Sequence, residues 1–335
     1  MRSYAAESAG LRELCRGLLE RGEVGAVVAW VAGDPLRVRV ALIEKGREEL
    51  LDRIAWSPFC APSTATFLKK NRKALEGKRI GIVVKDCDFA ALNVMLQENL
   101  INKDAVVTIG VRCDGLASGD FFEPAGATGR EITSDAEGVT VDGRRGLWPE
   151  LAPATCATCH YDWMEPDHVV GEYERRKEKG EWRHITRLRA LPSGERRERF
   201  RRMFEACIRC YACREVCPVC SCLECAIDPG ERCITPRTTP GEKTAVPLWA
   251  SREREPAENA VYLITRAMHM AGRCVRCGWC ERACPVGIPL MEIIDLVNHA
   301  VSRIYLYEPG RDPALLPFLA SFSESDPADS GGEPL

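Results

Sequence analysis

The 335-residue sequence has no long hydrophobic run, because no stretch approaches the roughly 20 apolar residues that a membrane-spanning helix needs. The first residues, Met1 to Glu7, also lack the apolar core of a secretory signal peptide. A formal net charge of −3 at pH 7 argues against general nucleic-acid binding. We therefore expect a cytoplasmic protein with no membrane insertion and no nucleic-acid partner.

The residue patterns of common hydrolases and nucleotide-dependent enzymes are missing as well. The sequence shows no Ser-His-Asp set, no paired-carboxylate site and no glycine-rich phosphate loop. Asp86 and Asp88 follow a hydrophobic run, and we interpret them as caps of the next helix rather than as catalysts. The sequence therefore assigns no catalytic residue.

Cysteine, by contrast, is abundant, with 18 in the chain. The stretches 207–218 and 274–285 share the spacing Cys-x2-Cys-x2-Cys-x3-Cys-Pro. In this motif a tight loop turns three thiolates toward one cluster and sends the fourth toward a neighbouring cluster. Structural zinc is the alternative, but a zinc knuckle uses two Cys pairs rather than a triplet and a fourth Cys. The spacing predicts two 4Fe-4S clusters.

Two-cluster ferredoxins exchange the fourth ligand between their motifs. The expected ligands are Cys207, Cys210, Cys213 and Cys284 for one 4Fe-4S cluster, and Cys274, Cys277, Cys280 and Cys217 for the other. Pro218 and Pro285 suit loops that end there, because proline lacks an N–H and restricts its own backbone angle.

The N-terminal half alternates hydrophobic runs with helical patterns. Apolar residues at helical spacing predict a first helix that ends near Gly22, with Cys15 in the core. The β-prone runs 24–31 and 37–43 predict strands. Between 79 and 111, a strand, a helix and a strand form a right-handed unit with parallel strands. We expect an α/β N-terminal domain with a mainly parallel sheet, followed by a small hairpin near 130–145.

Cys87 and Cys113 each follow a strand of this unit. We expect both to be functional, because open α/β sheets bind ligands at the carboxyl ends of their strands. The pair Cys156 and Cys159 is compatible with half a cluster site, a zinc site with His160, or a redox dithiol. We favour a third 4Fe-4S cluster. Its ligands would be Cys87, Cys113, Cys156 and Cys159, with Cys60 in reserve.

This half contains three short motifs in sequence: Ser8-Ala-Gly10 before a helix, Ile82-Val-Val-Lys-Asp-Cys87, and Ile109-Gly-Val-Arg-Cys113. On these motifs, residues 8–115 and the Cys pair near 156 resemble the beta subunits of deazaflavin-reducing hydrogenases and formate dehydrogenases. The resemblance implies an iron–sulfur cluster and a flavin, with Ser8 and Gly10 in the flavin loop. Because Ala9 stands where a second Gly is usual, the backbone approaches a flavin less closely, and FAD is kept as an alternative.

Helical patterns bracket each motif of the C-terminal half. One begins near Arg196, a second starts at Pro256 with an apolar stripe that includes Val261 and Met268, and a third starts at Pro289. With its paired cysteine motifs, this half resembles the α-helical ferredoxin domain of succinate dehydrogenase iron–sulfur subunits and heterodisulfide reductase C subunits. The resemblance implies an all-α domain with two 4Fe-4S clusters.

Four further cysteines lie between the motifs: Cys220, Cys222, Cys225 and Cys233. Their tight spacing could chelate an extra metal, while spare cluster ligands or reduced surface thiols are the alternatives. Residues 171–202 hold twelve Lys or Arg against six Glu, which suits a solvated linker or a docking face for an acidic partner. The expected organisation is an α/β domain at 1–165, a charged linker at 166–194, a ferredoxin domain at 195–307 and a disordered acidic tail at 308–335.

Together these patterns predict an iron–sulfur electron-transfer subunit of an anaerobic oxidoreductase complex, of the hydrogenase, formate dehydrogenase or heterodisulfide reductase type. Its partners would be the catalytic and electron-transfer subunits of that complex, or ferredoxin. One alternative is a flavin-containing subunit that exchanges hydride with a deazaflavin or a nicotinamide. The other is a zinc-stapled scaffold without redox activity.

Overall fold

The chain divides into two units in the computed structural model, which describes residues 2–122, 131–159, 161, 165–171, 182–222, 225, 227 and 254–321. The first unit comprises Met1–Glu181, Val275–Trp279 and Pro309–Pro317, and the second comprises Trp182–Cys274, Cys280–Glu308 and Phe318–Leu335. The first unit has mixed sheets with helices and the second is helical, which confirms the expected α/β N-terminal half and helical C-terminal region. Over the described ranges, no helix is both long and apolar enough to cross a bilayer.

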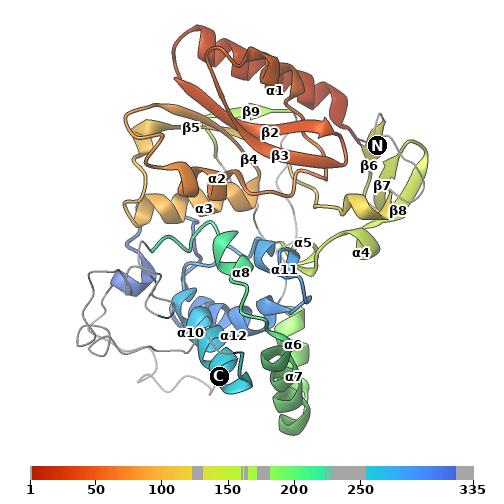
Figure 1. Cartoon of the computed structure of the whole chain (residues 1–335), viewed down its shortest axis with the longest axis vertical. Coiled ribbons are helices and arrows are strands. Elements are labelled where there is room, and N and C mark those ends of the chain that lie inside the picture. Colours follow the sequence, from red (N-terminus) through yellow and green to blue (C-terminus); the bar gives the residue numbers. More distant parts are fainter. Residues whose placement is uncertain are drawn as a thin grey trace. The chain divides into compact units, whose positions relative to one another are not determined.

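A five-stranded sheet organises the first unit (Figure 1). Its strands, in spatial order, are β3 (Arg37–Glu44), β2 (Ala26–Asp34), β4 (Ile80–Val84), β5 (Val106–Val111) and β9 (His168–Val170). β2 pairs with β3 in antiparallel fashion, and the other three pairings are parallel. The expected mainly parallel sheet and strand–helix–strand unit are therefore present.

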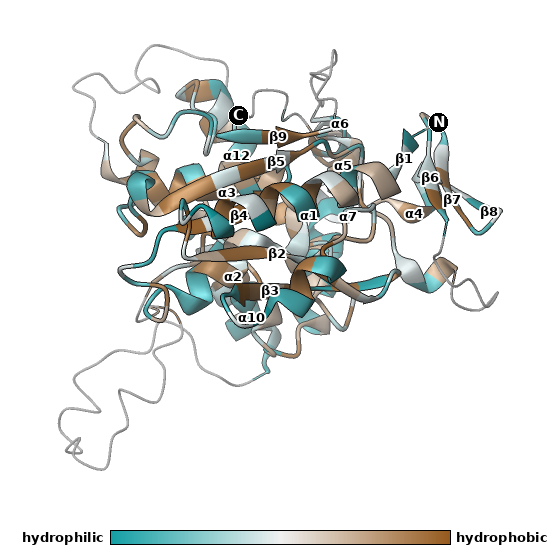
Figure 2. Cartoon of the chain, turned by 90° about the horizontal axis from the view of Figure 1, so that it is seen from above, coloured by the Kyte–Doolittle hydropathy of each residue, from teal (hydrophilic) through white to brown (hydrophobic). Residues whose placement is uncertain are grey.

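Helices cover both faces of this sheet. Helix α1 (Tyr4–Glu20) lies on one face, and α2 (Thr64–Asn71) and α3 (Asp86–Gln97) lie on the other (Figure 1). Figure 2 shows hydrophobic residues along β2 and β5. All five residues of β4 are buried, as expected for a strand with both faces covered, because such a strand has no solvent side to carry polar residues.

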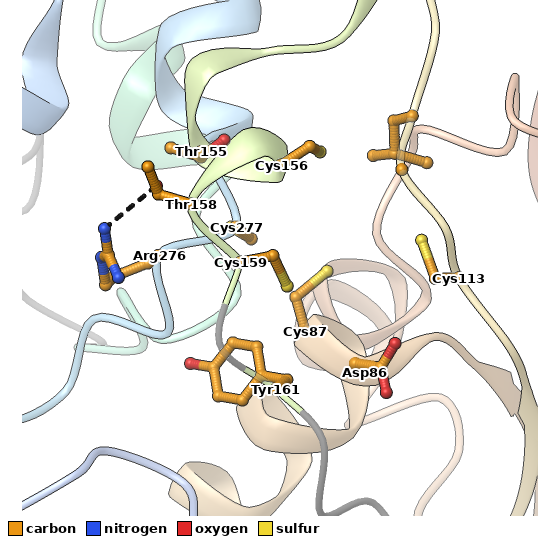
Figure 3. Close-up of a pocket in the computed structure, with 12 residues that line it drawn as sticks. Asp86, Cys87, Cys113, Thr155, Cys156, Thr158, Cys159, Tyr161, Arg276 and Cys277 are labelled. Atoms are coloured by element: carbon orange, nitrogen blue, oxygen red, sulfur yellow. Dashed lines mark hydrogen bonds between the residues drawn. The ribbon is translucent and has the colours of Figure 1, made fainter. Parts of the chain in front are cut away.

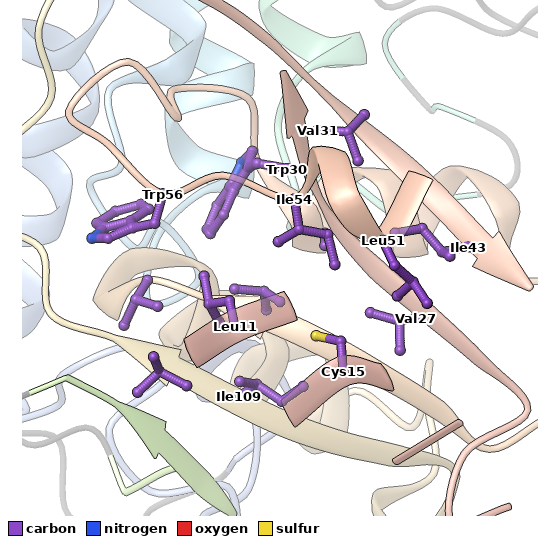
Figure 4. Packing of buried hydrophobic residues seen from close by; sticks show 14 of the residues in the cluster. Leu11, Cys15, Val27, Trp30, Val31, Ile43, Leu51, Ile54, Trp56 and Ile109 are labelled. Atoms are coloured by element: carbon purple, nitrogen blue, oxygen red, sulfur yellow. The ribbon is translucent and has the colours of Figure 1, made fainter. Parts of the chain in front are cut away.

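The main hydrophobic core fills the space between α1 and the sheet (Figure 4). Trp30 of β2 and Trp56 pack with their ring centroids 5.2 Å apart. Cys15 is fully buried in this core, as the sequence predicted. Cys60, the reserve cluster ligand, belongs to the same core, where its Sγ lies 3.5 Å from the carbonyl oxygen of Ala55. Both thiols therefore act as small hydrophobic side chains.

Burial gives these two thiols a testable pH signature. It raises the pKa of Cys15 and that of Cys60 from 9.0 to about 12. Because the unfolded chain ionises them first, each contributes stability that is complete below pH 9.0 and declines as the pH rises toward about 12. The decline should be about 1.4 kcal/mol per pH unit for each thiol.

We therefore expect the stability advantage of the natural chain over Cys60→Ala to shrink between pH 8 and pH 11, as measured by equilibrium unfolding at several pH values. Native protein treated with iodoacetamide at pH 8 should also leave Cys15 and Cys60 unmodified in peptide mass spectra, because the thiolate is the nucleophile. Rapid alkylation of either thiol in the folded chain would contradict this account.

A second, four-stranded antiparallel sheet also belongs to the first unit. Its strands are β1 (Arg2–Ser3), β6 (Ile132–Ser134), β7 (Gly138–Val141) and β8 (Arg144–Leu147). β6 and β7 form the expected hairpin, with Ile132 opposite Val141 and Ser134 opposite Val139. Its buried side chains, including Val139 and Val141, pack with Phe59 and Phe122 in a separate small core.

The second unit is helical and contains the first cysteine motif and both ends of the second. Its helices are α6 (Arg183–Ala190), α7 (Ser193–Ala206), α8 (Ala212–Glu215), α10 (Pro256–His269) and α12 (Leu290–Ile304), while α11 (Trp279–Arg282) begins at the boundary of the two units. The helices expected near Arg196, from Pro256 and after Pro289 are all present. Short elements complete the chain: η1 (Glu48–Arg53), η2 (Lys103–Ala105), η3 (Gly119–Phe121), α4 (Trp148–Leu151), α5 (Ala154–Ala157) and η6 (Phe318–Ala320).

The apolar stripe expected on α10 packs inward only in part, because Ala267 is buried but the larger side chains are not. Val261, Ile264 and Met268 are 42%, 49% and 56% exposed. The buried face also includes the polar residues Asn259 and Arg266. Hydrophobic periodicity alone predicted this face only in part, because contacts with the cysteine loops orient the helix.

Part of the segment expected to be a disordered tail makes specific contacts. Within the first unit, Asn93 donates a hydrogen bond to the carbonyl oxygen of Gly310 (2.9 Å), and Gln97 donates one to that of Asp312 (2.8 Å). A Cβ at Gly310 would lie 2.2 Å from the carbonyl oxygen of Ala90, so this close approach to α3 requires glycine. Residues 309–317 are thus anchored to α3, and residues 322–335 lie outside the described part of the chain.

Candidate metal centre

The two cysteine motifs have loops with the same backbone pattern. In the first motif Arg209 and Tyr211 have φ angles of 55° and 60°, and at the matching positions of the second Arg276 and Gly278 have 49° and 68°. Three of these four residues are not glycine, so each loop holds a costly left-handed conformation. Alternation of left- and right-handed residues points successive N–H groups into a concavity, which suits phosphate and iron–sulfur sites. Both loops are therefore shaped to hold an anionic group.

The first set of thiols surrounds a pocket in the second unit. Its lining includes Cys207, Cys210, Cys213 and Cys284, which are the four residues that the crossed arrangement predicts for one cluster. The structure thus brings the fourth cysteine of the second motif to the first three of the first motif. Apolar side chains complete the pocket, among them Ile208, Leu263 and Ile288.

The reciprocal neighbours also lie together in the second unit. Cys217 and Cys280 are both buried. Burial raises the pKa of Cys280 well above its usual range; the Arg266 guanidinium acts in the opposite direction, and the charges of Cys274 and Cys217 raise that pKa further. Cys217, from the first motif, is therefore close enough to interact electrostatically with Cys280. Cys277, the remaining predicted ligand of this set, is grouped with the first unit.

Helix α10 holds the first motif along its buried face. The Asn259 side-chain amide donates hydrogen bonds to the carbonyl oxygens of Phe204 (2.8 Å) and Cys207 (2.9 Å). Seven residues further, Arg266 donates to the carbonyl oxygen of Cys213 (2.8 Å). The sequence reasoning missed both residues. Their signal was a polar pair at helical spacing on the face opposite the larger residues of the apolar stripe.

Two methionines contact the more deeply buried thiols. Met270, just after α10, has its Sδ 3.9 Å from Cys217 Sγ, and Met291 of α12 has its Sδ 3.9 Å from Cys280 Sγ. The carboxylate of Glu281 accepts a hydrogen bond from the Met291 N–H (2.8 Å) and so ties α12 to the second motif. These flexible thioethers give the two thiols an apolar, polarizable environment.

A third group of thiols lines a pocket of the first unit (Figure 3). It contains Cys87, Cys113, Cys156 and Cys159, the four residues predicted for a third cluster, together with Cys277. In Figure 3 the side chains of Cys87 and Cys159 point toward one another. Cys87 lies in the first turn of α3 after β4, and Cys113 follows β5. Both thus lie at the carboxyl edge of the parallel strands, as expected.

The loop that carries Cys113 is held by Arg2. The Arg2 guanidinium pairs with Glu7 and with Asp114, each at 2.6 Å, and donates to the carbonyl oxygen of Arg112 (2.9 Å). On the other side of the pocket Arg276 donates to Thr158 Oγ1 (3.3 Å). Charged donors therefore bind the chain at two sides of this group of thiols.

The glycine of the second motif has a packing reason. Gly278 has φ +68°, and a Cβ there would lie 2.2 Å from Thr155 Oγ1. Tyr211, at the matching position of the first motif, has a similar φ of 60° and carries a side chain. The Gly in place of Tyr therefore reflects the close approach of Thr155 rather than a difference in loop conformation.

A buried ion pair lies beside Cys87. Lys85 Nζ is 2.6 Å from Asp88 Oδ2 and 4.7 Å from the centre of the Trp30 ring, and Ser63 Oγ donates to Asp88 Oδ1 (2.5 Å). Burial alone would lower the pKa of Lys85, but Asp88 raises it above its usual range, so the pair is charged. The interpretation of Asp86 and Asp88 as helix caps is therefore wrong for Asp88. Lys85 is the N-cap residue, and its side chain makes no capping bond.

Ser8 and Gly10, the residues of the expected flavin loop, lie inside α1. The Ser8 hydroxyl donates to the carbonyl oxygen of Tyr4 (2.8 Å) and accepts from the N–H of Trp56 (3.0 Å). A Cβ on Gly10 would lie 3.0 Å from a methyl group of Val170. The helix therefore begins before this motif, and Gly10 serves the packing of α1 against β9.

The cysteines between the motifs are only partly within the described residues. Cys220 and Cys225 are half-buried and Cys222 is exposed, whereas Cys233 and the alternative zinc ligand His160 lie outside that part of the chain. In the portion that the structure describes, no three His, Cys, Asp or Glu side chains gather closely enough to hold a single metal ion. The thiols of the first and third sets instead line pockets, which fits a polynuclear cluster with its thiolate ligands spread around it.

Comparisons with known proteins agree with this chemistry. A family model described as a 4Fe-4S binding domain matches residues 268–289, which include the second motif. The F420-dependent formate dehydrogenase subunit beta of Methanocaldococcus jannaschii is 24% identical over an alignment of 368 positions, covering 91% of this chain and 92% of that protein. The F420-dependent formate dehydrogenase 1 subunit beta of Methanococcus maripaludis is 25% identical, covering 64% of this chain and 72% of that protein.

Among solved structures, a chain of the F420-reducing [NiFe] hydrogenase complex from Methanosarcina barkeri, studied by xenon derivatization, matches 46% of this chain and 58% of its own length. The TM-score is 0.35 and the identity 14%. The sequence comparisons confirm the resemblance inferred from the sequence motifs. The chain is homologous to the beta subunits of F420-dependent formate dehydrogenases and carries a 4Fe-4S binding domain, which identifies an iron–sulfur oxidoreductase subunit.

Proposed function

We propose that the chain is the electron-transfer subunit of a larger redox complex and holds two 4Fe-4S clusters in an all-α, ferredoxin-like region at 195–307. The observation that carries the proposal is the exchange of neighbours between the motifs. Cys284 lines one pocket with Cys207, Cys210 and Cys213, and Cys217 lies near Cys280. This exchange is characteristic of two-cluster ferredoxins, and it supports the assignment of all eight cysteines as ligands.

Bound clusters would supply one-electron transfer, and the chain's own residues would set the conditions for it. The loop N–H groups of both motifs are placed for hydrogen bonds to sulfur. The apolar pocket lining and the two methionines limit water access. These features tune reduction potentials, and substrate chemistry takes place on a partner subunit. We propose that this partner is the catalytic subunit, since the relatives are themselves named as subunits of formate dehydrogenases.

We further propose that Cys87, Cys113, Cys156 and Cys159 hold a third 4Fe-4S cluster, in an α/β domain at 1–165. The convergence of three separate segments on one pocket supports this set. Replacing Cys159 by Ala should lower the iron content of anaerobically purified protein from about twelve to about eight per chain, with sulfide falling in parallel. Cys15→Ala is the matched control and should leave both unchanged. Equal iron in Cys159→Ala and the natural chain would show that Cys159 is not a ligand.

Quantitation of iron, labile sulfide, zinc and flavin on one anaerobic sample tests the function as a whole. We expect about twelve irons with matching sulfide, whereas about eight would mean the two ferredoxin-type clusters only. Bound flavin would favour the alternative of hydride exchange with a deazaflavin or nicotinamide. Zinc with little iron would establish the alternative of a zinc-stapled scaffold and would refute the proposed electron-transfer function. A cytoplasmic location, where thiols stay reduced, belongs to the same proposal.

A further inference from the structure

Arg266 is a buried cation that faces thiols of both crossed sets. It lies on the inner face of α10 and is 3% exposed. Its side chain donates to the backbone of Cys213, which is assigned to the first cluster. Its carbonyl oxygen accepts from the N–H of Met270 (3.1 Å), whose Sδ lies 3.9 Å from the Sγ of Cys217, which is assigned to the second. All four residues belong to the second unit.

Most of the hydrogen-bonding capacity of this side chain is unused by the protein. One Nη donates to the carbonyl oxygen of Cys213 (2.8 Å). Among the described residues, Nε and the other Nη are buried without a hydrogen-bond partner. A buried guanidinium with idle donors is costly unless an anion lies nearby, and cluster-bound thiolates of the neighbouring cysteines would supply that anion. Arg266 keeps its charge, because a guanidinium does not lose its proton in proteins.

Among the described residues, no carboxylate forms an ion pair with Arg266. The groups with the largest electrostatic effect on it are the thiols of Cys217, Cys213 and Cys280. A cluster held by four thiolates is a net anion whose negative charge grows on reduction. A fixed cation and N–H donors directed at its sulfurs therefore stabilise the reduced state more than the oxidised state. Because solvent does not screen a buried charge, its effect reaches both neighbouring sites.

We infer that Arg266 is a shared cation that raises the reduction potentials of both ferredoxin-type clusters together. This inference rests on the proposed function, because it requires that both clusters bind. It assigns the common shift of both reduction potentials to one side chain. Removal of the charge should make both clusters harder to reduce, whereas a residue serving one cluster would shift one potential alone.

The test is a redox titration of the natural chain, Arg266→Gln, Arg266→Met and Arg266→Lys, monitored by electron paramagnetic resonance on anaerobic protein of measured iron and sulfide content. At a fixed potential, Gln and Met should lower the ratio of reduced to oxidised cluster at least tenfold at both sites, which is about 59 mV for a one-electron couple. Arg266→Lys, which keeps the charge, should stay closer to the natural chain. The control Arg197→Met removes an exposed positive charge of α7 and should shift neither potential.

The outcomes separate this inference from the proposed function. A natural chain without iron and sulfide refutes the proposed function itself. Intact clusters with one potential shifted, or neither, in Arg266→Gln and Arg266→Met overturn the shared-cation role and leave the proposed function standing. If Gln and Met fail to load iron while Lys loads it, the requirement for charge is upheld. If all three fail, Arg266 acts through packing and the inference is wrong.

Discussion

A chain in which Cys207 and Cys284 are both replaced by Ala should lose one ferredoxin-type cluster and keep the other unperturbed. The two residues lie in different motifs but line the same pocket, so the double change removes two ligands from one site. We expect a loss of about four irons and four sulfides per chain, with one unaltered 4Fe-4S signal in the electron paramagnetic resonance spectrum of the reduced protein.

The matched variant replaces Cys207 and Cys217, two cysteines of the same motif. In the crossed arrangement it removes one ligand from each site, so both signals should change. If each motif instead held its own cluster, the two variants would exchange results. Unchanged iron in both variants would show that these cysteines are not ligands, and with them the proposed function would fail.

Replacing Asp88 by Ala should lower the free energy of unfolding by about 3–5 kcal/mol, because it leaves the buried Lys85 ammonium without a counter-charge. The side chains of both partners are only 2% exposed, so water cannot replace the lost carboxylate. Ser63, which caps α2 by accepting from the Thr66 N–H, loses its acceptor in the same change. Anaerobic chemical denaturation followed by tryptophan fluorescence measures this loss.

Two controls show whether the unpaired charge is the cause. The double variant Lys85→Met with Asp88→Leu removes both charges and should recover most of the stability, because apolar replacements of a buried pair are often neutral. Asp52→Ala breaks the exposed pair with Arg16 and should cost at most about 1 kcal/mol. A double variant as unstable as Asp88→Ala would instead point to lost packing.

Local patterns predicted most elements of the fold. The run after Gly25 became the buried strand β2, and Pro256 begins α10 as a first-turn proline. The hairpin near 130–145 formed with the expected facing residues. These features depend on neighbours within a few residues, where periodicity and turn chemistry are informative.

Features that depend on distant contacts were harder to predict. Ser8 and Gly10 were expected in a loop, but α1 begins at Tyr4, and the Ser8 hydroxyl binds the backbone of Trp56. Asp88 was expected to cap α3, but its carboxylate instead pairs with the Lys85 ammonium. Both side chains are buried, and the ammonium lies over the Trp30 ring. In each case tertiary packing overrode a sound local preference.

The sequence by itself determined the candidate ligands, because the spacing of its thiols encodes a chelating loop. The same spacing in the two motifs that begin at Cys207 and Cys274 has few other uses. Only the tertiary structure decided which side of α10 faces those thiols. That side carries Asn259 and Arg266 rather than the larger residues of the apolar stripe, because loop carbonyls and thiolates require donors and a positive charge, and these needs arise only when the chain has folded.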